Sequence, residues 1–146
     1  MSDIKFGTDG WRAIIAKDYT VDNVARVSIA VALWLKDNFD SPSVVIGHDC
    51  RFGGELFAET TAKVLAYHKI NVKMAKGFVS TPMVSLGVVR QETNLGIVIT
   101  ASHNPPTYNG YKLKGDFGGP LLPHNISEVE KLIPSKNNID LDLLSI

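Results

Sequence analysis

Residues 95–105 read Leu95-Gly-Ile-Val-Ile-Thr-Ala-Ser-His-Asn-Pro105, and this stretch decides how the chain around it folds. The apolar run at its start has the length and composition of a buried strand in a parallel sheet. Pro105 and Pro106 keep the segment that follows from becoming a helix. The strand therefore delivers Ser102 and His103 into a loop at the mouth of an α/β sheet, where such folds place ligands and reactive groups.

The rest of the chain alternates helix patterns with strand patterns. Four apolar residues recur at helical spacing after Thr20, a suitable N-cap: Val24, Val27, Val31 and Leu35. The sequence therefore predicts a helix over Val21–Asn38. Further helices are predicted over residues 55–68, 81–92 and 125–133, with Ser127 as a cap of the last.

Strand patterns occupy residues 4–15, 43–46, 71–75 and 95–100, and residues 111–114 form a short further strand in a hairpin with 95–100. Strands that alternate with helices of this length imply βαβ units with right-handed crossovers. The predicted fold class is α/β: a three-layer αβα domain with a mostly parallel, mixed sheet of four strands between helices.

Residues 1–134 are expected to form this domain, and residues 135–146 a linker or the start of the next domain. The tail loses its helical signals at Pro134, where Ser135, Asn137 and Asn138 cluster. Its apolar side chains are expected to be exposed, cut off from their packing partners, and able to drive weak self-association: Ile139, Leu141, Leu143 and Leu144.

Composition limits the classes of function. The chain has 146 residues, 45% of them hydrophobic, and a formal net charge of zero, which suits one globular core and excludes disorder. The balanced charge argues against a nucleic-acid partner. The longest apolar stretch, Val27–Leu35, is too short to span a membrane. A lone cysteine, Cys50, forms no intramolecular disulfide, so we expect a cytoplasmic protein.

His48 and Cys50 are interpreted as packing residues, and the spacing of His68 and His124 predicts no zinc site.

Three motifs occur in order along the chain: Phe6-Gly-Thr-Asp-Gly-Trp-Arg12, Gly47-His-Asp-Cys-Arg51 and the segment from Thr100 to Lys112. Together they resemble the opening signature, the Gly-x-Asp-x-Arg pattern and the phosphoserine loop of the α-D-phosphohexomutases, the phosphoglucomutase/phosphomannomutase family. The resemblance covers essentially the whole chain.

This resemblance implies that Ser102 rests as phosphoserine and donates its phosphoryl group to a hydroxyl of a hexose monophosphate. The bisphosphorylated sugar then turns around and returns its other phosphate to the serine. His103 and Lys112 would surround the transferring phosphate as proton-handling groups, and Arg12 would clamp phosphate, so these four residues form both the catalytic and the substrate-binding set. One Mg²⁺ ion would contact the phosphate on Ser102. Its other ligands lie outside this chain, so the ion is expected to be absent here. A hexose 1,6-bisphosphate would act as activator.

Each of these residues also has a purely structural alternative. His103 could hydrogen-bond the loop backbone, and Lys112 could be a solvated strand residue. Arg12 could pair with Asp9 or Asp49. For Arg51 the structural role is favoured: the Gly47-to-Arg51 motif would fix the turn from strand to helix, with Asp49 bonding backbone amides.

The family's enzymes are several-fold longer and have four domains, and the resemblance maps onto the first. The expectation is therefore the first domain of a phosphohexomutase, inactive on its own, with sugar phosphates and the missing domains as its partners. Phosphoglucomutase/phosphomannomutase is the favoured parent, and phosphoglucosamine mutase or phosphopentomutase the alternatives within the superfamily. A non-catalytic sugar-phosphate-binding or protein-binding domain remains a rival. A serine hydrolase built on Ser102 and His103 lacks the Gly-x-Ser-x-Gly elbow.

Overall fold

A computed structural model of the chain describes residues 3–7 and 10–145, and within these ranges five strands form one sheet. The strand order is β1-β5-β4-β2-β3, with bounds Trp11–Ile14 (β1), Ser43–His48 (β2), Asn71–Phe78 (β3), Leu95–Ile99 (β4) and Tyr108–Gly115 (β5). Strands β3, β2 and β4 are parallel, and β5 pairs antiparallel with both β4 and β1. The predicted hairpin and mixed sheet are confirmed.

The sheet has five strands rather than the four predicted, because the further strand expected over residues 111–114 joins it as β5. The N-terminal strand pattern gives β1, whose Trp11 lies opposite Tyr111 and whose Ile14 lies opposite Tyr108, so it extends the sheet at the edge. This pairing joins segments almost a hundred residues apart, and local sequence patterns carry no information about it.

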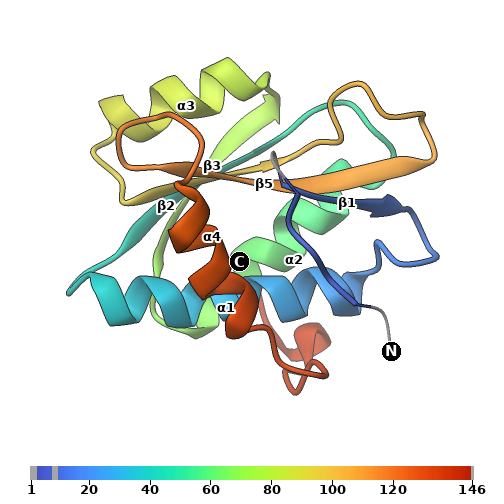
Figure 1. Cartoon of the computed structure of the whole chain (residues 1–146), viewed down its shortest axis with the longest axis horizontal. Coiled ribbons are helices and arrows are strands. Elements are labelled where there is room, and N and C mark those ends of the chain that lie inside the picture. The colour runs from blue at the N-terminus through green and yellow to red at the C-terminus, as the bar shows by residue number, and fades with distance from the viewer. Residues whose placement is uncertain (1–2, 8–9, 146) are drawn as a thin grey trace.

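Helices cover both faces of the sheet, which confirms the three layers (Figure 1). Helices α1 (Val21–Asn38), α2 (Gly54–Tyr67) and α4 (Pro123–Lys131) lie on one face, and α3 (Thr81–Arg90) lies on the other. Alternation along the strands produces two cores. Ile97 and Ile99 of β4 pack towards α1 and α2, whereas Val98 packs against Val84 and Val88 of α3.

Two of the helix starts follow from capping chemistry. The bounds predicted for α1 are confirmed, and the Thr20 hydroxyl accepts a hydrogen bond from the Asn23 amide at 3.2 Å. The predicted start of the last helix is wrong. Helix α4 begins at Pro123, which suits the first turn because it needs no N–H partner there, and Ser127 lies inside the helix rather than at its cap.

The tail packs against the domain instead of hanging free. A 3₁₀ helix, η1 (Leu141–Leu143), lies by α2, where the Lys63 ammonium donates to the Leu141 carbonyl oxygen at 3.4 Å. The expectation of four exposed tail residues is wrong for three, because Leu143 alone among them is fully exposed (82%) and the others are half-buried: Ile139, Leu141 and Leu144. Self-association through the tail stays a prediction, and it now rests on Leu143.

In the described part of the chain, no helix has the length and apolar character needed to cross a membrane.

Candidate active site

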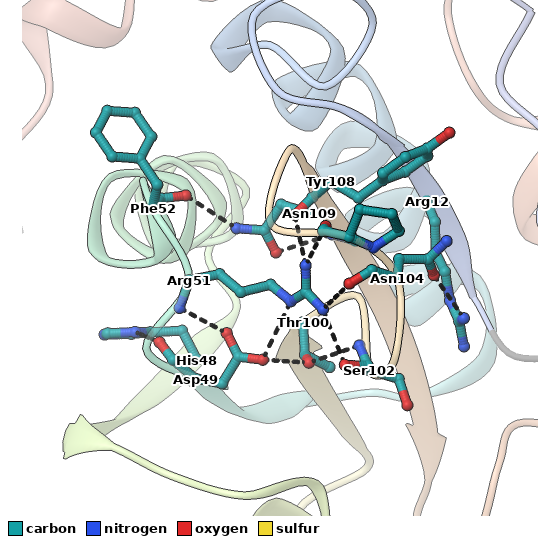
Figure 2. A network of polar contacts seen from close by, with 12 residues as sticks. Arg12, His48, Asp49, Arg51, Phe52, Thr100, Ser102, Asn104, Tyr108 and Asn109 are labelled. Carbon is teal, nitrogen blue, oxygen red and sulfur yellow. Dashed lines mark hydrogen bonds and ion pairs between the residues drawn. The ribbon is translucent and has the colours of Figure 1, made fainter.

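The loop of residues 100–107 joins β4 to β5 at the carboxyl end of the parallel strands, where open α/β sheets bind their ligands. Strand pairing extends into its base, because the Thr100 amide donates to the Gly110 carbonyl oxygen at 3.1 Å. The turn that follows β2 lies beneath this loop, and Arg12 on β1 lies at its side (Figure 2). The sheet therefore brings all three sequence motifs together at one end of its strands.

Ser102 lies exposed on this loop in a left-handed backbone conformation, with φ at +53°. A residue with a Cβ atom adopts that conformation at a cost, which the surrounding contacts must offset. Its amide donates to the Thr100 hydroxyl at 3.1 Å, and its carbonyl oxygen accepts from Arg51 at 2.8 Å. Figure 2 shows the Ser102 hydroxyl turned away from this network.

Arg51 is the centre of the polar network (Figure 2). Its Nη atoms donate to four backbone carbonyl oxygens at 2.7 to 3.0 Å, and its Nε lies 3.8 Å from the Asp49 carboxylate. The four carbonyls belong to the loop and the first residue of β5: Ser102, Asn104, Pro105 and Tyr108. The structural role predicted for Arg51 is therefore confirmed, although its partners lie in the serine loop as well as in its own turn.

Asp49 links the two loops. Its carboxylate accepts from the Arg51 amide at 3.1 Å and from the buried Thr100 hydroxyl, which in turn accepts from the Ser102 amide. The predicted bond from Asp49 to a backbone amide is confirmed. The chain from Asp49 through Thr100 to Ser102 fixes the serine from below, and Arg51 fixes it from the carbonyl side.

Arg12 reaches the same loop from β1, and its Nη1 donates to the Asn104 side-chain oxygen at 2.8 Å. The alternative partner Asp49 is instead the ion-pair partner of Arg51, and Asp9 lies outside the described residues. A cavity of about 420 Å³ lies beside Arg12 and is lined also by Lys5 and Asp18. A cationic side chain thus borders both the serine loop and an open pocket.

His103 and Lys112 occupy different environments. His103 is exposed, and no described residue hydrogen-bonds its ring. Lys112 lies on β5, opposite Val98 of β4, and is buried (5% exposed). It is therefore not the solvated strand residue of the alternative interpretation. The N-terminal motif crosses close above it, because a Cβ atom on Gly10 would come within 3.0 Å of the Lys112 side chain.

Two buried tyrosines support the base of the site. The Tyr19 hydroxyl donates to the Gly110 carbonyl oxygen at 2.7 Å, and the Tyr111 hydroxyl lies 3.0 Å from the Ser28 hydroxyl. Burial raises the pKa of Tyr19 well above its ordinary value, and the nearby Tyr111 and Asp49 raise it further. Burial likewise raises the pKa of Tyr111, against a smaller lowering by hydrogen bonds to Ser28 and Thr61. Both therefore stay neutral donors and hold β5 in place.

The described residues do not form a metal site by themselves. Among the described residues, no group of three or more His, Cys, Asp or Glu side chains could hold an ion. A phosphate on Ser102 would supply oxygen ligands, but the carboxylates that Mg²⁺ prefers are not gathered around it. His48 is a packing residue as predicted, with its ring against Phe78 and bonded to the Asp49 carbonyl. Cys50 is exposed, so the packing role predicted for it is wrong: it sits on the outer side of the turn.

Three site residues were not singled out from the sequence, namely Thr100, Asn104 and Asn109. Asn109 is fully buried and bonds both the Phe52 carbonyl and the Gly110 amide, so it joins the turn that follows the second motif to β5. All three lie within the segment from Thr100 to Lys112, and polar residues at a strand end were the available signal.

Comparison with known proteins places this architecture among characterised folds. The sequence model described as phosphoglucomutase/phosphomannomutase, alpha/beta/alpha domain I, matches residues 3–140. A phosphoglucomutase of Staphylococcus saprophyticus is 38% identical over 135 residues, which is 90% of this chain and 24% of that protein.

Solved structures agree with the sequence comparison. The crystal structure of a protein assigned as a phosphomannomutase from Thermus thermophilus superposes with a TM-score of 0.90 at 36% identity, over 92% of this chain and 31% of that one. A phosphoglucomutase/phosphomannomutase family protein from Burkholderia thailandensis gives a TM-score of 0.73 at 27% identity, over 91% of this chain and 30% of that one. The chain thus spans about a quarter to a third of the length of these relatives.

Proposed function

Because the chain belongs to the phosphoglucomutase/phosphomannomutase family, at the alpha/beta/alpha domain I, we propose that it is the phosphoserine-loop domain of a phosphohexomutase. Such an enzyme is an isomerase that interconverts hexose 1-phosphate and hexose 6-phosphate. The observation that carries the proposal is Ser102, an exposed hydroxyl on a strained and rigidly held loop beside Arg12. A group that must give and take a phosphoryl needs both access and a fixed position.

The proposed reaction has two transfers that mirror each other. In the first, the bond between phosphorus and the Ser102 oxygen breaks, phosphorus bonds to a sugar hydroxyl oxygen that gives up its proton, and the Ser102 oxygen takes up a proton. After the bisphosphorylated sugar has turned around, its other phosphoryl group passes to the Ser102 oxygen, which gives up its proton, and the freed sugar oxygen takes up a proton. The net result is that the phosphate has changed position on the sugar and Ser102 is phosphorylated again.

The remaining residues have proposed roles that follow from their chemistry. Arg12 suits phosphate because a guanidinium matches two phosphate oxygens at once. The exposed imidazole of His103 would carry protons, and the buried Lys112 would supply positive charge behind the loop. Mg²⁺ would neutralise charge on the moving phosphoryl when bound, with ligands supplied mainly from outside this chain, and a hexose 1,6-bisphosphate would prime Ser102. Neither of the two phosphoryl transfers is assigned to residues that would hold the metal ion.

Glucose and mannose phosphates are the proposed substrates, because the named relatives are phosphoglucomutases and a phosphomannomutase. Glucosamine phosphate is the alternative within the same chemistry. The other domains of such an enzyme are the proposed partners, and the cytoplasm the proposed location.

Ser102→Ala tests the proposal in the complete enzyme. Loss of the hydroxyl should abolish turnover of glucose 1-phosphate, while the thermal midpoint of the domain changes little, because an exposed hydroxyl contributes little to stability. Activity assays and circular dichroism melts measure the two effects. A phosphate adduct at Ser102 in the intact mass of the unmodified protein supports the proposal, and retained turnover in the variant contradicts it. Labelling of Ser102 by a fluorophosphonate probe would favour a hydrolase instead.

A further inference from the structure

The guanidinium of Arg51 uses all of its Nη hydrogens on the backbone of the serine loop. Nη1 donates to the carbonyl oxygens of Pro105 (2.8 Å) and Tyr108 (3.0 Å), and Nη2 to those of Ser102 (2.8 Å) and Asn104 (2.7 Å). A guanidinium has five N–H groups, and the fifth, on Nε, faces Asp49 at 3.8 Å. Arg51 is therefore not placed to grip a phosphoryl group itself, although it lies beneath Ser102.

This arrangement determines which side of the loop faces outward. In a planar trans peptide unit the C=O and N–H bonds point in opposite directions, and the described residues contain no cis peptide. Because the Ser102 carbonyl points at Arg51, the His103 amide points away from it, to the outer side where the Ser102 hydroxyl also lies (Figure 2). The negative ends of four peptide dipoles are thus gathered inward on one cation.

We infer that Arg51 is a positioning residue for the Ser102 phosphoryl group: it holds Ser102 at φ +53° and turns the loop carbonyls away from the anion. This inference rests on the proposed function for its catalytic consequence. Outward carbonyl oxygens would repel a group carrying nearly two negative charges, whereas an outward amide such as that of His103 attracts it. The carbonyls of Asn104 and Pro105 precede prolines, which have no N–H, so at these two positions Arg51 only keeps the carbonyl oxygens inward. The guanidinium therefore favours the phosphorylated serine without touching it.

The geometry requires arginine rather than positive charge alone. A lysine presents three hydrogens from a single nitrogen, so it cannot reach four carbonyls arranged around a planar fork. Arg51→Lys therefore keeps the charge and removes the clamp. Arg26 offers a control at a second enclosed arginine: it is buried (7% exposed), whereas Arg51 is partly buried, and it bonds the Pro134 carbonyl and the Asn23 side chain on α1.

The first test observes the clamp in the unmodified 146-residue chain. In ¹⁵N NMR spectra of the arginine side chains, Arg51 is expected to give four separate Nη–H signals that exchange slowly with water, because all four hydrogens are bonded. Averaged, rapidly exchanging signals for Arg51 would overturn the inference. This measurement needs no variant and no catalytic activity.

The second test compares Arg51→Lys with Arg26→Lys by amide hydrogen exchange in the same chain. The reporters are the amides of Asn104, which donates to the Ala101 carbonyl, and Tyr108, which donates to the Pro105 carbonyl. Arg51→Lys should speed their exchange about tenfold and leave the α1 amides unchanged. Arg26→Lys should leave the loop unchanged. Unchanged loop exchange in Arg51→Lys contradicts the clamp, and if that variant loses protection in α1 as well, the Nη signals of the unmodified chain decide.

The third test is kinetic and uses the complete enzyme. Arg51→Lys should lower kcat about tenfold with little change in KM, since positioning acts on the transferring group rather than on sugar binding. Arg26→Lys should change neither constant, and equal kcat values for the two variants would refute the catalytic consequence. If Ser102→Ala keeps its turnover, the proposed function fails. The arginine ¹⁵N spectra and the amide hydrogen exchange still decide whether Arg51 clamps the loop.

Discussion

At the scale of single residues, the site depends on groups whose ionisation and geometry are set by burial. The side chains of Arg51 and Thr100 hydrogen-bond to the backbone of Ser102. The hydroxyls of Tyr19 and Tyr111 hold β5, which lies beneath the loop. The motif segments predicted that Ser102 and Arg12 lie at one end of the sheet. They could not predict that Arg51 bonds four carbonyls, because that depends on how a proline-containing loop turns in three dimensions.

The raised pKa of Tyr111 predicts a specific alkaline weakness. Above about pH 10 the tyrosine ionises in the unfolded chain but not in the folded one, so unfolding releases a proton and stability falls as the pH rises. The loss is about 1.4 kcal/mol per pH unit for each such tyrosine until its folded-state pKa is reached. Tyr19 contributes in the same direction. Below about pH 10 both tyrosines are protonated in the folded and in the unfolded chain, so neither adds any pH dependence to the stability.

Tyr111→Phe should therefore lower stability at neutral pH by about 1 kcal/mol, through the lost hydrogen bond to Ser28, and roughly halve the alkaline slope. Urea denaturation at a series of pH values above about 9 measures both effects. Tyr67→Phe, at an exposed position on α2, controls for loss of a hydroxyl as such. A variant with the same alkaline slope as the unmodified chain would show that the buried hydroxyl does not control it.

At the scale of secondary-structure elements, the sequence was most informative where the signal is local. The bounds of α1 were predicted to the residue, because both the apolar period and the Thr20 cap lie within the segment. For α4 the Ser127 signal competed with Pro123, and the proline prevailed because its fixed φ already suits the first turn. The membership of β1 in the sheet depends on a distant partner, so no local pattern could show it.

Two helix ends carry strain that a glycine would relieve. Lys69 after α2 and Glu92 after α3 have φ of +66° and +52°, and each is followed by an amide that bonds back into its helix. Lys69→Gly and Glu92→Gly should each raise the free energy of unfolding by about 0.5 to 1 kcal/mol. Lys63→Gly inside α2 should lower it by about 1 kcal/mol. Chemical denaturation of the three variants measures their free energies of unfolding. A loss of stability in both Lys69→Gly and Glu92→Gly would refute the strain argument.

At the scale of the whole molecule, the chain forms a folded domain with an exposed serine loop at one end of its sheet. It spans 24% of a phosphoglucomutase relative, and its described residues form no cluster that could hold a metal ion. The loop also lies at the carboxyl end of the parallel strands, where Ser102 is exposed to water.

The 146-residue chain alone is therefore expected to show no mutase turnover, even with Mg²⁺ and a hexose 1,6-bisphosphate supplied. Electrostatic stabilisation of the moving phosphoryl supplies most of the rate enhancement in such catalysis. No cluster of His, Cys, Asp or Glu among the described residues could hold the metal ion that would contribute to it. A coupled assay that follows glucose 6-phosphate formation from glucose 1-phosphate makes the measurement. Robust magnesium-dependent interconversion by the purified chain would show that the domain suffices.

The pairing of β1 with β5 has a consequence for biosynthesis. Trp11 is made early, but its partner Tyr111 emerges 100 residues later (111 − 11), which is about 5 to 20 s at ribosomal rates of ~5–20 residues per second. During that delay β1 has no strand beside it, whereas β4 and β5 form a hairpin within seconds of each other. Arg12 can meet Asn104 only after this edge closes. The nascent chain therefore carries Arg12 long before it carries the serine loop, and a chaperone that shields the waiting strand would act during this interval.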